Sequence, residues 1–151
     1  MLRQQLNEAL KEAMRAKDQR TLATVRLVMA GLKDRDIQAR TSGQGDCISD
    51  EEILDLLQKM VKQRREAMEI YEQGKRSDLV EKEAAEIEVL ERFLPRQLDE
   101  DETKAAVYEV IQELDAGNVK DMGRVMSALK ERYAGRMDFA RASQQVKQAL
   151  V

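Results

Sequence analysis

The stretch Leu94-Pro95-Arg96-Gln97 decides how this chain is divided. Pro95 is the only proline among 151 residues, and a proline biases the residue before it away from helical backbone. Apolar residues recur at helical spacing on both sides of the stretch. The sequence therefore predicts a boundary between two helical domains, residues 1–94 and residues 95–151.

Two helices joined by a short turn are predicted at the start of the first domain. Apolar residues three and four apart give residues 2–16 one buried face, and Asp18 can cap a second helix. The second helix is expected to bury a stripe that ends at Ile37. Residues 40–48 form the one obvious loop. A two-residue connection makes the pair an antiparallel hairpin.

A second hairpin is predicted between this loop and the boundary. Ser49 and Glu52 have the spacing of a capping box at the start of a long helix, for which Gly74 is placed as the C-cap. Ser77 then opens a fourth helix, whose apolar stripe continues to Leu94. The first domain is therefore expected to hold four helices in two hairpins.

Three shorter helices are predicted after the boundary. Asp99 can cap the first of them, Gly117-Asn118 ends it, Gly135 ends the second, and Asp138 can cap the third. No segment alternates apolar and polar residues with a period of two. The predicted fold class is all-α, with an N-terminal four-helix domain followed by a small C-terminal three-helix domain.

The composition excludes several classes of site. The chain has no histidine and one cysteine, Cys47, so it can form neither a histidine-based triad nor an internal disulfide. We expect no metal and no cofactor. No stretch is long and apolar enough for a signal peptide or a membrane span. These features predict a cytoplasmic protein without a membrane partner.

The charges are unevenly distributed along the chain. The net charge is −3, from 26 basic and 29 acidic residues. Residues 118–151 nevertheless hold seven basic and three acidic residues, whereas residues 95–117 hold two basic and seven acidic ones. A basic terminal segment indicates a surface that faces phosphate.

None of the reactive groups has the neighbours that catalysis needs. Cys47 has no base to activate it and has Asp46 beside it. Gly43-Gln44-Gly45 lacks the Lys-Ser/Thr of a phosphate loop. Clustered carboxylates, as in residues 99–102, stand at helix starts, where they stabilise the helix dipole. The sequence therefore predicts no catalytic residue.

Basic residues also gather on the second and third predicted helices. On the third helix they are followed by Glu66, Glu69 and Glu72, so they predict either a salt-bridged solvent face or a surface for an anionic partner. The cations of the third helix are Lys59, Lys62, Arg64 and Arg65. The cations of the second helix and its approach are Arg20, Arg26, Lys33 and Arg35.

Gly123 stands inside a helical pattern, where glycine costs about 1 kcal/mol relative to alanine. Either close helix packing or access of a ligand to the backbone would compensate for that cost. Met122 and Met126 have the spacing of core residues, which favours packing.

Several motifs together resemble the YqeY family over essentially the whole chain. They include Ile48-Ser49-Asp50-Glu51-Glu52, Phe93-Leu94-Pro95-Arg96-Gln97-Leu98 and Lys120-Asp121-Met122-Gly123. This family shares its C-terminal module with the tail of the GatB subunit of glutamine-dependent tRNA amidotransferase. In that enzyme the tail helps to hold tRNA, while other domains carry the catalysis.

The resemblance implies that the C-terminal segment of this chain contacts tRNA or another structured RNA. The candidate residues, called the tail residues below, are the seven cations and the two glycines of residues 118–151. They are Lys120, Gly123, Arg124, Lys130, Arg132, Gly135, Arg136, Arg141 and Lys147. Among them Arg136 is the sharpest candidate, because it follows a glycine and precedes a capping aspartate, and is expected to project from a loop.

Two other functions stay open at this point. Long amphipathic helices and eight methionines suit an interaction protein that docks on an amidotransferase or another protein partner. Association with the amidotransferase suggests a carbon–nitrogen ligase with glutamine as amido-N-donor. That reaction needs an activated nucleophile and a nucleotide site, and the sequence shows neither.

Overall fold

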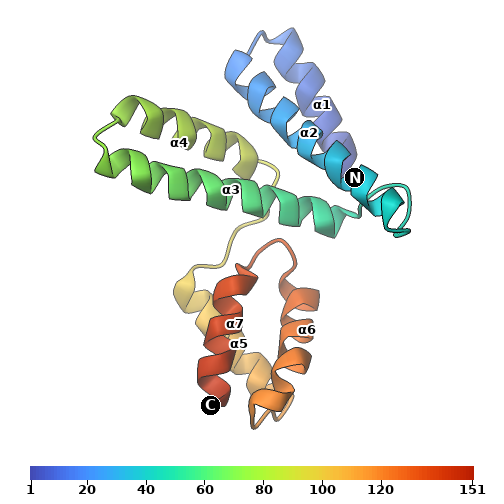
Figure 1. The fold of residues 1–151 in the computed structure, drawn as a ribbon, viewed down its shortest axis with the longest axis vertical. Helices are drawn as coiled ribbons and strands as arrows, with labels where there is room; N and C mark the ends of the chain where they lie inside the picture. The colour runs from blue at the N-terminus through green and yellow to red at the C-terminus, as the bar shows by residue number, and fades with distance from the viewer. The chain divides into compact units, whose positions relative to one another are not determined.

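The computed structural model describes residues 1–151 and is entirely helical. It contains seven α-helices, one short 3-10 helix and no strand (Figure 1), which confirms the all-α prediction. The helices are α1 (Leu2–Arg15), α2 (Gln19–Thr41), α3 (Asp50–Gln73), α4 (Ser77–Glu91), α5 (Glu100–Glu113), η1 (Val119–Asp121), α6 (Met122–Tyr133) and α7 (Phe139–Leu150).

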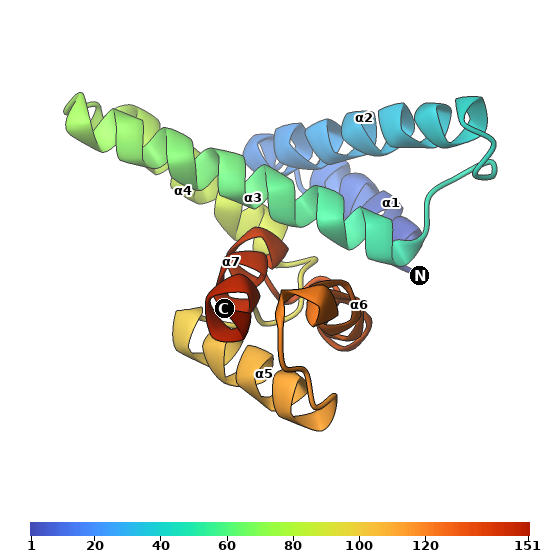
Figure 2. The same ribbon diagram turned by 60° about the horizontal axis from the view of Figure 1, so that its bottom comes forward.

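The helices form two compact units, unit 1 (Met1–Pro95) and unit 2 (Arg96–Val151). In unit 1, α1 lies beside α2 and α3 lies beside α4 (Figures 1 and 2). Leucine and isoleucine side chains from all four helices are fully buried between them. The largest are Leu6, Leu32, Ile53, Leu57 and Leu90.

The buried residues of unit 1 differ from the predicted apolar stripes at two places. Ile37 is 48% exposed, whereas the neighbouring Asp36 is 7% exposed. The helix α4 ends at Glu91, so Phe93 and Leu94 pack against the core from the turn that follows. In both places tertiary contacts override the local apolar pattern.

Asp36 is buried because three groups satisfy its carboxylate. Arg3 of α1 donates from Nη1 to Oδ2 at 2.8 Å and from Nη2 to Oδ1 at 3.0 Å. The backbone N–H of Ile48 donates to Oδ1 at 2.9 Å, and Arg3 Nη2 also donates to the carbonyl of Ile48 at 3.3 Å. These hydrogen bonds tie α1, α2 and the loop before α3 together, and the Arg3 guanidinium lowers the pKa of Asp36.

The outer part of the α3–α4 hairpin has no core of its own. Within residues 62–86 no side chain is buried, although Met68, Tyr71, Leu79 and Val80 are half-buried. Figures 1 and 2 show this end of the hairpin extending beyond α1 and α2. We call residues 62–86 the hairpin arm.

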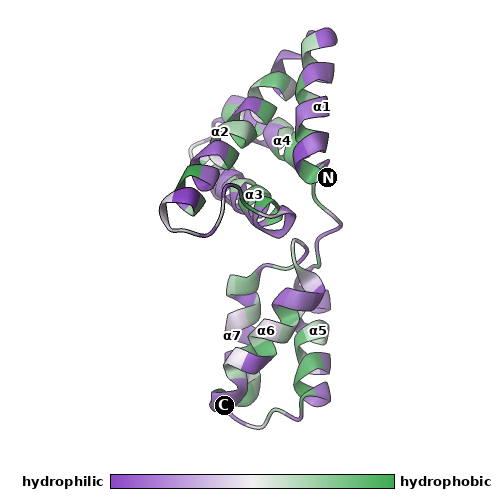
Figure 3. Ribbon diagram, turned by 90° about the vertical axis from the view of Figure 1, so that its right-hand side faces the viewer, coloured by the Kyte–Doolittle hydropathy of each residue, from purple (hydrophilic) through white to green (hydrophobic).

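In unit 2 each of α5, α6 and α7 packs against the other two. Valine is the most frequent residue of the small core, and Leu129 and Met137 are also fully buried. Figure 3 shows polar and apolar residues interleaved along each helix, as amphipathic helices around one core require.

Three helices are followed, directly after the C-cap, by a residue in the left-handed region that is not glycine. These residues are Lys17 (φ 55°), Lys75 (φ 58°) and Asp115 (φ 51°). After α3, Gly74 is the C-cap as predicted, but Lys75 takes the positive φ, and the N–H of Arg76 bonds back to the carbonyl of Tyr71. At the end of α5 the break comes at Asp115, before the predicted Gly117-Asn118.

The predicted N-caps of the helices are confirmed, but the predicted capping box of Ser49 and Glu52 forms only one of its two hydrogen bonds. Asp18, Ser49, Asp99 and Asp138 each accept a backbone N–H in the first turn of the next helix. A complete capping box forms at Asp99, where Glu102 Oε1 also accepts the N–H of Asp99 at 3.2 Å. These contacts fix where the helices begin.

Candidate nucleic-acid interface

The loop between α6 and α7 is held in place by the residues that open unit 2. Gly135 is buried with φ 78°, and its carbonyl accepts from Gln97 Nε2 at 2.6 Å. The carbonyl of Arg136 accepts the N–H of Leu98 at 2.8 Å. This role of Gln97 and Leu98 was not predictable from the sequence, because only the fold brings them to this loop.

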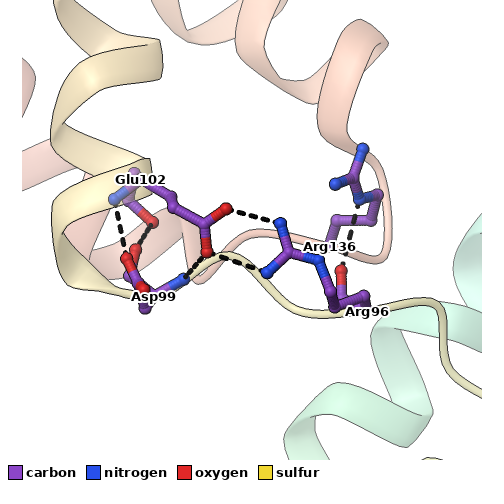
Figure 4. Close-up of polar contacts among 5 residues, drawn as sticks. Arg96, Asp99, Glu102 and Arg136 are labelled. Carbon is purple, nitrogen blue, oxygen red and sulfur yellow. Dashed lines mark hydrogen bonds and ion pairs between the residues drawn. The ribbon is translucent and has the colours of Figure 1, made fainter.

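The side chain of Arg136 is less exposed and more restricted than the sequence predicts. The residue is half-buried, and its Nε donates to the carbonyl of Arg96 at 3.3 Å (Figure 4). A guanidinium that holds two segments of unit 2 together contributes to structure. Replacing Arg136 would therefore disturb the loop as well as remove a charge.

Arg96 forms a forked ion pair close to this loop. Its guanidinium makes two hydrogen bonds to the Glu102 carboxylate, one of them at 3.0 Å, in the forked geometry of Figure 4. Arg96 first, and the N–H of Asp99 second, lower the pKa of Glu102 from its usual value of 4.5 to about 2. Glu102 therefore keeps its negative charge next to Arg96 and neutralises it.

The start of α6 is also ordered by local hydrogen bonds. Asn118 accepts the N–H of Lys120 at 2.9 Å, and Asp121 accepts the N–H of Gly117 at 3.0 Å. The Gly117 N–H and then the Arg124 guanidinium favour the charged form of Asp121 and lower its pKa. Arg124 pairs with Asp121 at 3.2 Å.

The seven cations among the tail residues differ in how they are neutralised. Arg124, Arg132 and Arg141 form ion pairs with Asp121, Glu113 and Asp138. Lys120, Lys130 and Lys147 are exposed and form no ion pair. These three lysines are the positive charges of the segment most available to a partner.

The tail residues do not converge on one compact site. Gly123 and Gly135 stand at opposite ends of α6, which at 1.5 Å per residue is about 18 Å long. Lys130 and Arg132 are two residues apart on the same helix and so point to opposite sides of it. The arrangement offers separate points of charge across unit 2.

Gly123 is not explained by close packing. A Cβ atom built on it would meet nothing within 4 Å, and the residue lies in the first turn of α6, exposed to solvent. The packing explanation that the sequence favoured is therefore wrong. The backbone of Gly123 is open to solvent at this helix start.

The basic stretch of α3 is neutralised, although mostly by other residues than the sequence predicts. Arg64 pairs with Glu86 and Arg65 with Glu91, both at 2.8 Å across the hairpin to α4. Lys59 pairs with Asp55 at 3.1 Å. These pairs support the salt-bridged face rather than the anionic-partner alternative, with α4 supplying two of the acids in place of Glu66, Glu69 and Glu72.

The remaining candidates offer little chemistry. Cys47 is an exposed free thiol. An open hollow of about 460 Å³ lies between the end of α2 and the start of α3 and is lined by residues such as Arg35, Gln44 and Glu52. No group of three or more acidic or cysteine side chains is placed to hold a metal ion. No helix is long and apolar enough to cross a bilayer.

Fungal proteins named "Altered inheritance of mitochondria protein 41, mitochondrial" are similar to this chain. The protein from Lachancea thermotolerans is 35% identical over 75% of the chain and 59% of its own length. The Kluyveromyces lactis protein is 35% identical over 72% of the chain and 58% of its length. The Pyrenophora tritici-repentis protein is 34% identical, over 84% of the chain and 70% of its length. The chain thus spans about three fifths of the first two relatives.

These names contradict the cytoplasmic localisation predicted from the sequence. The relatives are named as mitochondrial proteins, and the prediction was wrong. A low cysteine count and the lack of a long apolar stretch report on redox chemistry and membrane insertion. Neither property distinguishes the cytoplasm from a compartment inside an organelle.

The model of one protein family, described as Yqey-like protein, matches residues 3–150. The match includes both units and all seven α-helices. It agrees with the resemblance found in the sequence motifs. The chain belongs to the YqeY family.

Proposed function

We propose that this protein is a non-catalytic helical module that associates with tRNA or another structured RNA through unit 2. The observation that carries the proposal is the set of three exposed lysines, Lys120, Lys130 and Lys147, that no acidic side chain neutralises. They lie in the segment 118–151, whose net charge is +4. Phosphate groups attract such lysines without requiring a pocket.

Membership of the YqeY family supports this proposal. The family's C-terminal module resembles the tail of the GatB subunit, which helps to hold tRNA. On this reading units 1 and 2 correspond to two domains, residues 1–94 and 95–151, with four helices in two hairpins in the first domain and three helices in the second. Arg136 and Gly135 then maintain the conformation of the loop between α6 and α7, and the three exposed lysines contact phosphates.

A salt titration with labelled tRNA tests the proposal. The variant Lys120→Gln, Lys130→Gln, Lys147→Gln should bind more weakly than the wild type, and the magnitude of its salt slope should fall by about two to three. The control is Arg124→Gln, Arg132→Gln, Arg141→Gln, which removes the same charge from cations that are already paired. We expect this control to change binding less.

Two results would contradict the proposal. One is absence of tRNA binding by the wild-type chain at both low and moderate salt. The other is binding that the control variant reduces as much as the lysine variant, because the effect would then follow net charge alone.

An interaction with another protein, such as an amidotransferase, is the second candidate. Tyr108 on α5 is 63% exposed and Val119 before α6 is 48% exposed, and exposed aromatic residues are typical anchors of protein interfaces. Capture of a partner that survives nuclease treatment and is lost in Tyr108→Ser would favour this candidate. Loss of every partner with nuclease would favour RNA.

A further inference from the structure

The exposed face of α2 carries a row of cations in unit 1. Arg26, Lys33 and Arg40 are spaced seven residues apart and are all exposed. A spacing of seven returns to nearly the same side of a helix, with a drift of about 20° each time. The three side chains therefore form one stripe about 21 Å long, which we call the α2 stripe. Figure 2 shows α2 at the edge of unit 1.

No acidic side chain forms an ion pair with the α2 stripe. Arg26, Lys33 and Arg40 make no ion pair, and the hydrogen bond that Arg40 Nε donates goes to the backbone carbonyl of Asp46 at 2.9 Å. The cations of α3 differ, because Lys59, Arg64 and Arg65 all have acidic partners.

The acidic residues near the α2 stripe form ion pairs with other groups or with none. Asp36 is buried and hydrogen-bonded by Arg3, and the charge of Arg40 lowers the pKa of Asp36 only as a minor contribution after Arg3 and the Ile48 N–H. On α1, Glu8 and Glu12 lie about 140° and 180° around the helix from Arg3, the residue that faces α2. Asp34 is the one exposed acid of α2 between Arg26 and Arg40, and it lies about 100° around the helix from Lys33. None of the three cations of the stripe is therefore held in an ion pair.

We propose that the α2 stripe is a second RNA-binding surface, which contacts the phosphodiester backbone. This inference rests on the proposed function and extends it from unit 2 to unit 1. A backbone with one charge per nucleotide matches a straight row of cations, because several phosphates can face the row at once. Contacts of this kind position an RNA without reading its sequence.

The apolar content of α2 favours RNA over a membrane surface. A helix that lies in a membrane interface needs a broad apolar face free to enter the lipid. The apolar face of α2 is instead occupied by the core, where Val25, Val28 and Leu32 are buried. Only Leu27 and Ile37 are half-exposed on its outer side.

The experiment compares three variants of the full chain, each with three charges removed. The stripe variant is Arg26→Gln, Lys33→Gln, Arg40→Gln, and the tail variant is Lys120→Gln, Lys130→Gln, Lys147→Gln. The matched control is Lys59→Gln, Lys62→Gln, Arg65→Gln on α3. Glutamine has nearly the helix propensity of lysine and arginine, and circular dichroism checks that each variant is folded.

Each protein is titrated with labelled tRNA over a range of salt concentrations and, separately, with anionic phospholipid vesicles. We expect the stripe variant to lower the magnitude of the tRNA salt slope by about two to three relative to the wild type. The α3 control should leave the slope within about one unit of the wild type, and vesicle binding should be absent in all proteins.

The outcomes separate this inference from the proposed function. If the tail variant loses affinity and the stripe variant matches the α3 control, the α2 stripe is not an RNA surface and the proposed function stands. If the stripe variant alone loses affinity, the inference stands and the assignment to unit 2 fails. Absence of tRNA binding by the wild type overturns both, and vesicle binding that only the stripe variant loses overturns the inference in favour of a membrane.

Discussion

Arg3 and Asp36 are 33 residues apart in the sequence and form two hydrogen bonds, at 2.8 and 3.0 Å, between α1 and α2. Asp36 is almost fully buried, so its charge depends on this partner. Removing one member of a buried ion pair leaves the other charge without compensation. The pair therefore fixes α1 to α2 at this point.

Replacing Asp36 tests this dependence. Asp36→Asn should lower the free energy of unfolding by about 2–4 kcal/mol, because Arg3 loses its counter-charge and the Ile48 N–H loses part of its acceptor. Chemical denaturation measures the change. Asp34→Asn, two residues away and exposed, should change stability by less than about 0.5 kcal/mol, and equal losses in the two variants would contradict the role of the pair.

The low pKa of Glu102 predicts the pH range over which acid destabilises unit 2. Its folded-state pKa of about 2 lies below the usual 4.5, so the unfolded chain takes up the proton first as the pH falls. The contribution of the charged Glu102 carboxylate to folding stability is complete above pH 4.5 and is lost between pH 4.5 and about 2. Titration of the Glu102 carboxyl by NMR checks the value.

A pair of variants assigns the cause of that shift. Arg96→Gln should raise the pKa of Glu102 towards 4.5, because the forked hydrogen bonds are lost. Lys104→Gln removes a cation from α5 without touching those bonds and should leave the pKa low. A Glu102 that still titrates near 2 without Arg96 would show that Arg96 is not the main cause.

Two glycines of unit 2 should respond in opposite directions to alanine. Gly135 is buried with φ 78°, so Gly135→Ala should destabilise the protein by about 1–2 kcal/mol. Gly123 has helical backbone and open space around it, so Gly123→Ala should be neutral or stabilise by up to about 1 kcal/mol. Thermal unfolding of both variants decides the matter, and destabilisation by Gly123→Ala would indicate a contact that the structure does not show.

The left-handed residue after α3 predicts a stabilising change to glycine. Lys75→Gly should raise the free energy needed to open the hairpin arm, measured by amide exchange, by about 1 kcal/mol, because glycine adopts φ 58° without the Cβ clash of lysine. Lys82→Gly, inside α4, should lower the same free energy by about 1 kcal/mol. Changes of the same sign in the two variants would contradict this reading of the helix end.

The helices were predictable from sequence because their signals are local. The apolar spacing places the buried faces, and Asp18, Ser49, Asp99 and Asp138 each mark a helix start within a few residues of the groups they bond. The helix ends were harder to predict, because Lys17, Lys75 and Asp115 carry a conformation that sequence patterns assign to glycine.

The contacts within the units were not predictable in the same way. Burial of Asp36 depends on Arg3, and the pairing of Arg64 depends on Glu86, which only the folded hairpin brings close. The charge of residues 118–151 was visible in the sequence, but which of its cations keep acidic partners is a property of the fold.

The hairpin arm lacks buried side chains, and this gives the molecule an uneven resistance to opening. Backbone amides of residues 62–86 should exchange with deuterium through local fraying, whereas those of residues 53–61 need a larger unfolding event. The free energy needed to open the backbone thus falls along a single continuous helix, α3. A ligand that binds the hairpin arm would slow this amide exchange severalfold without changing the melting temperature of the rest of unit 1.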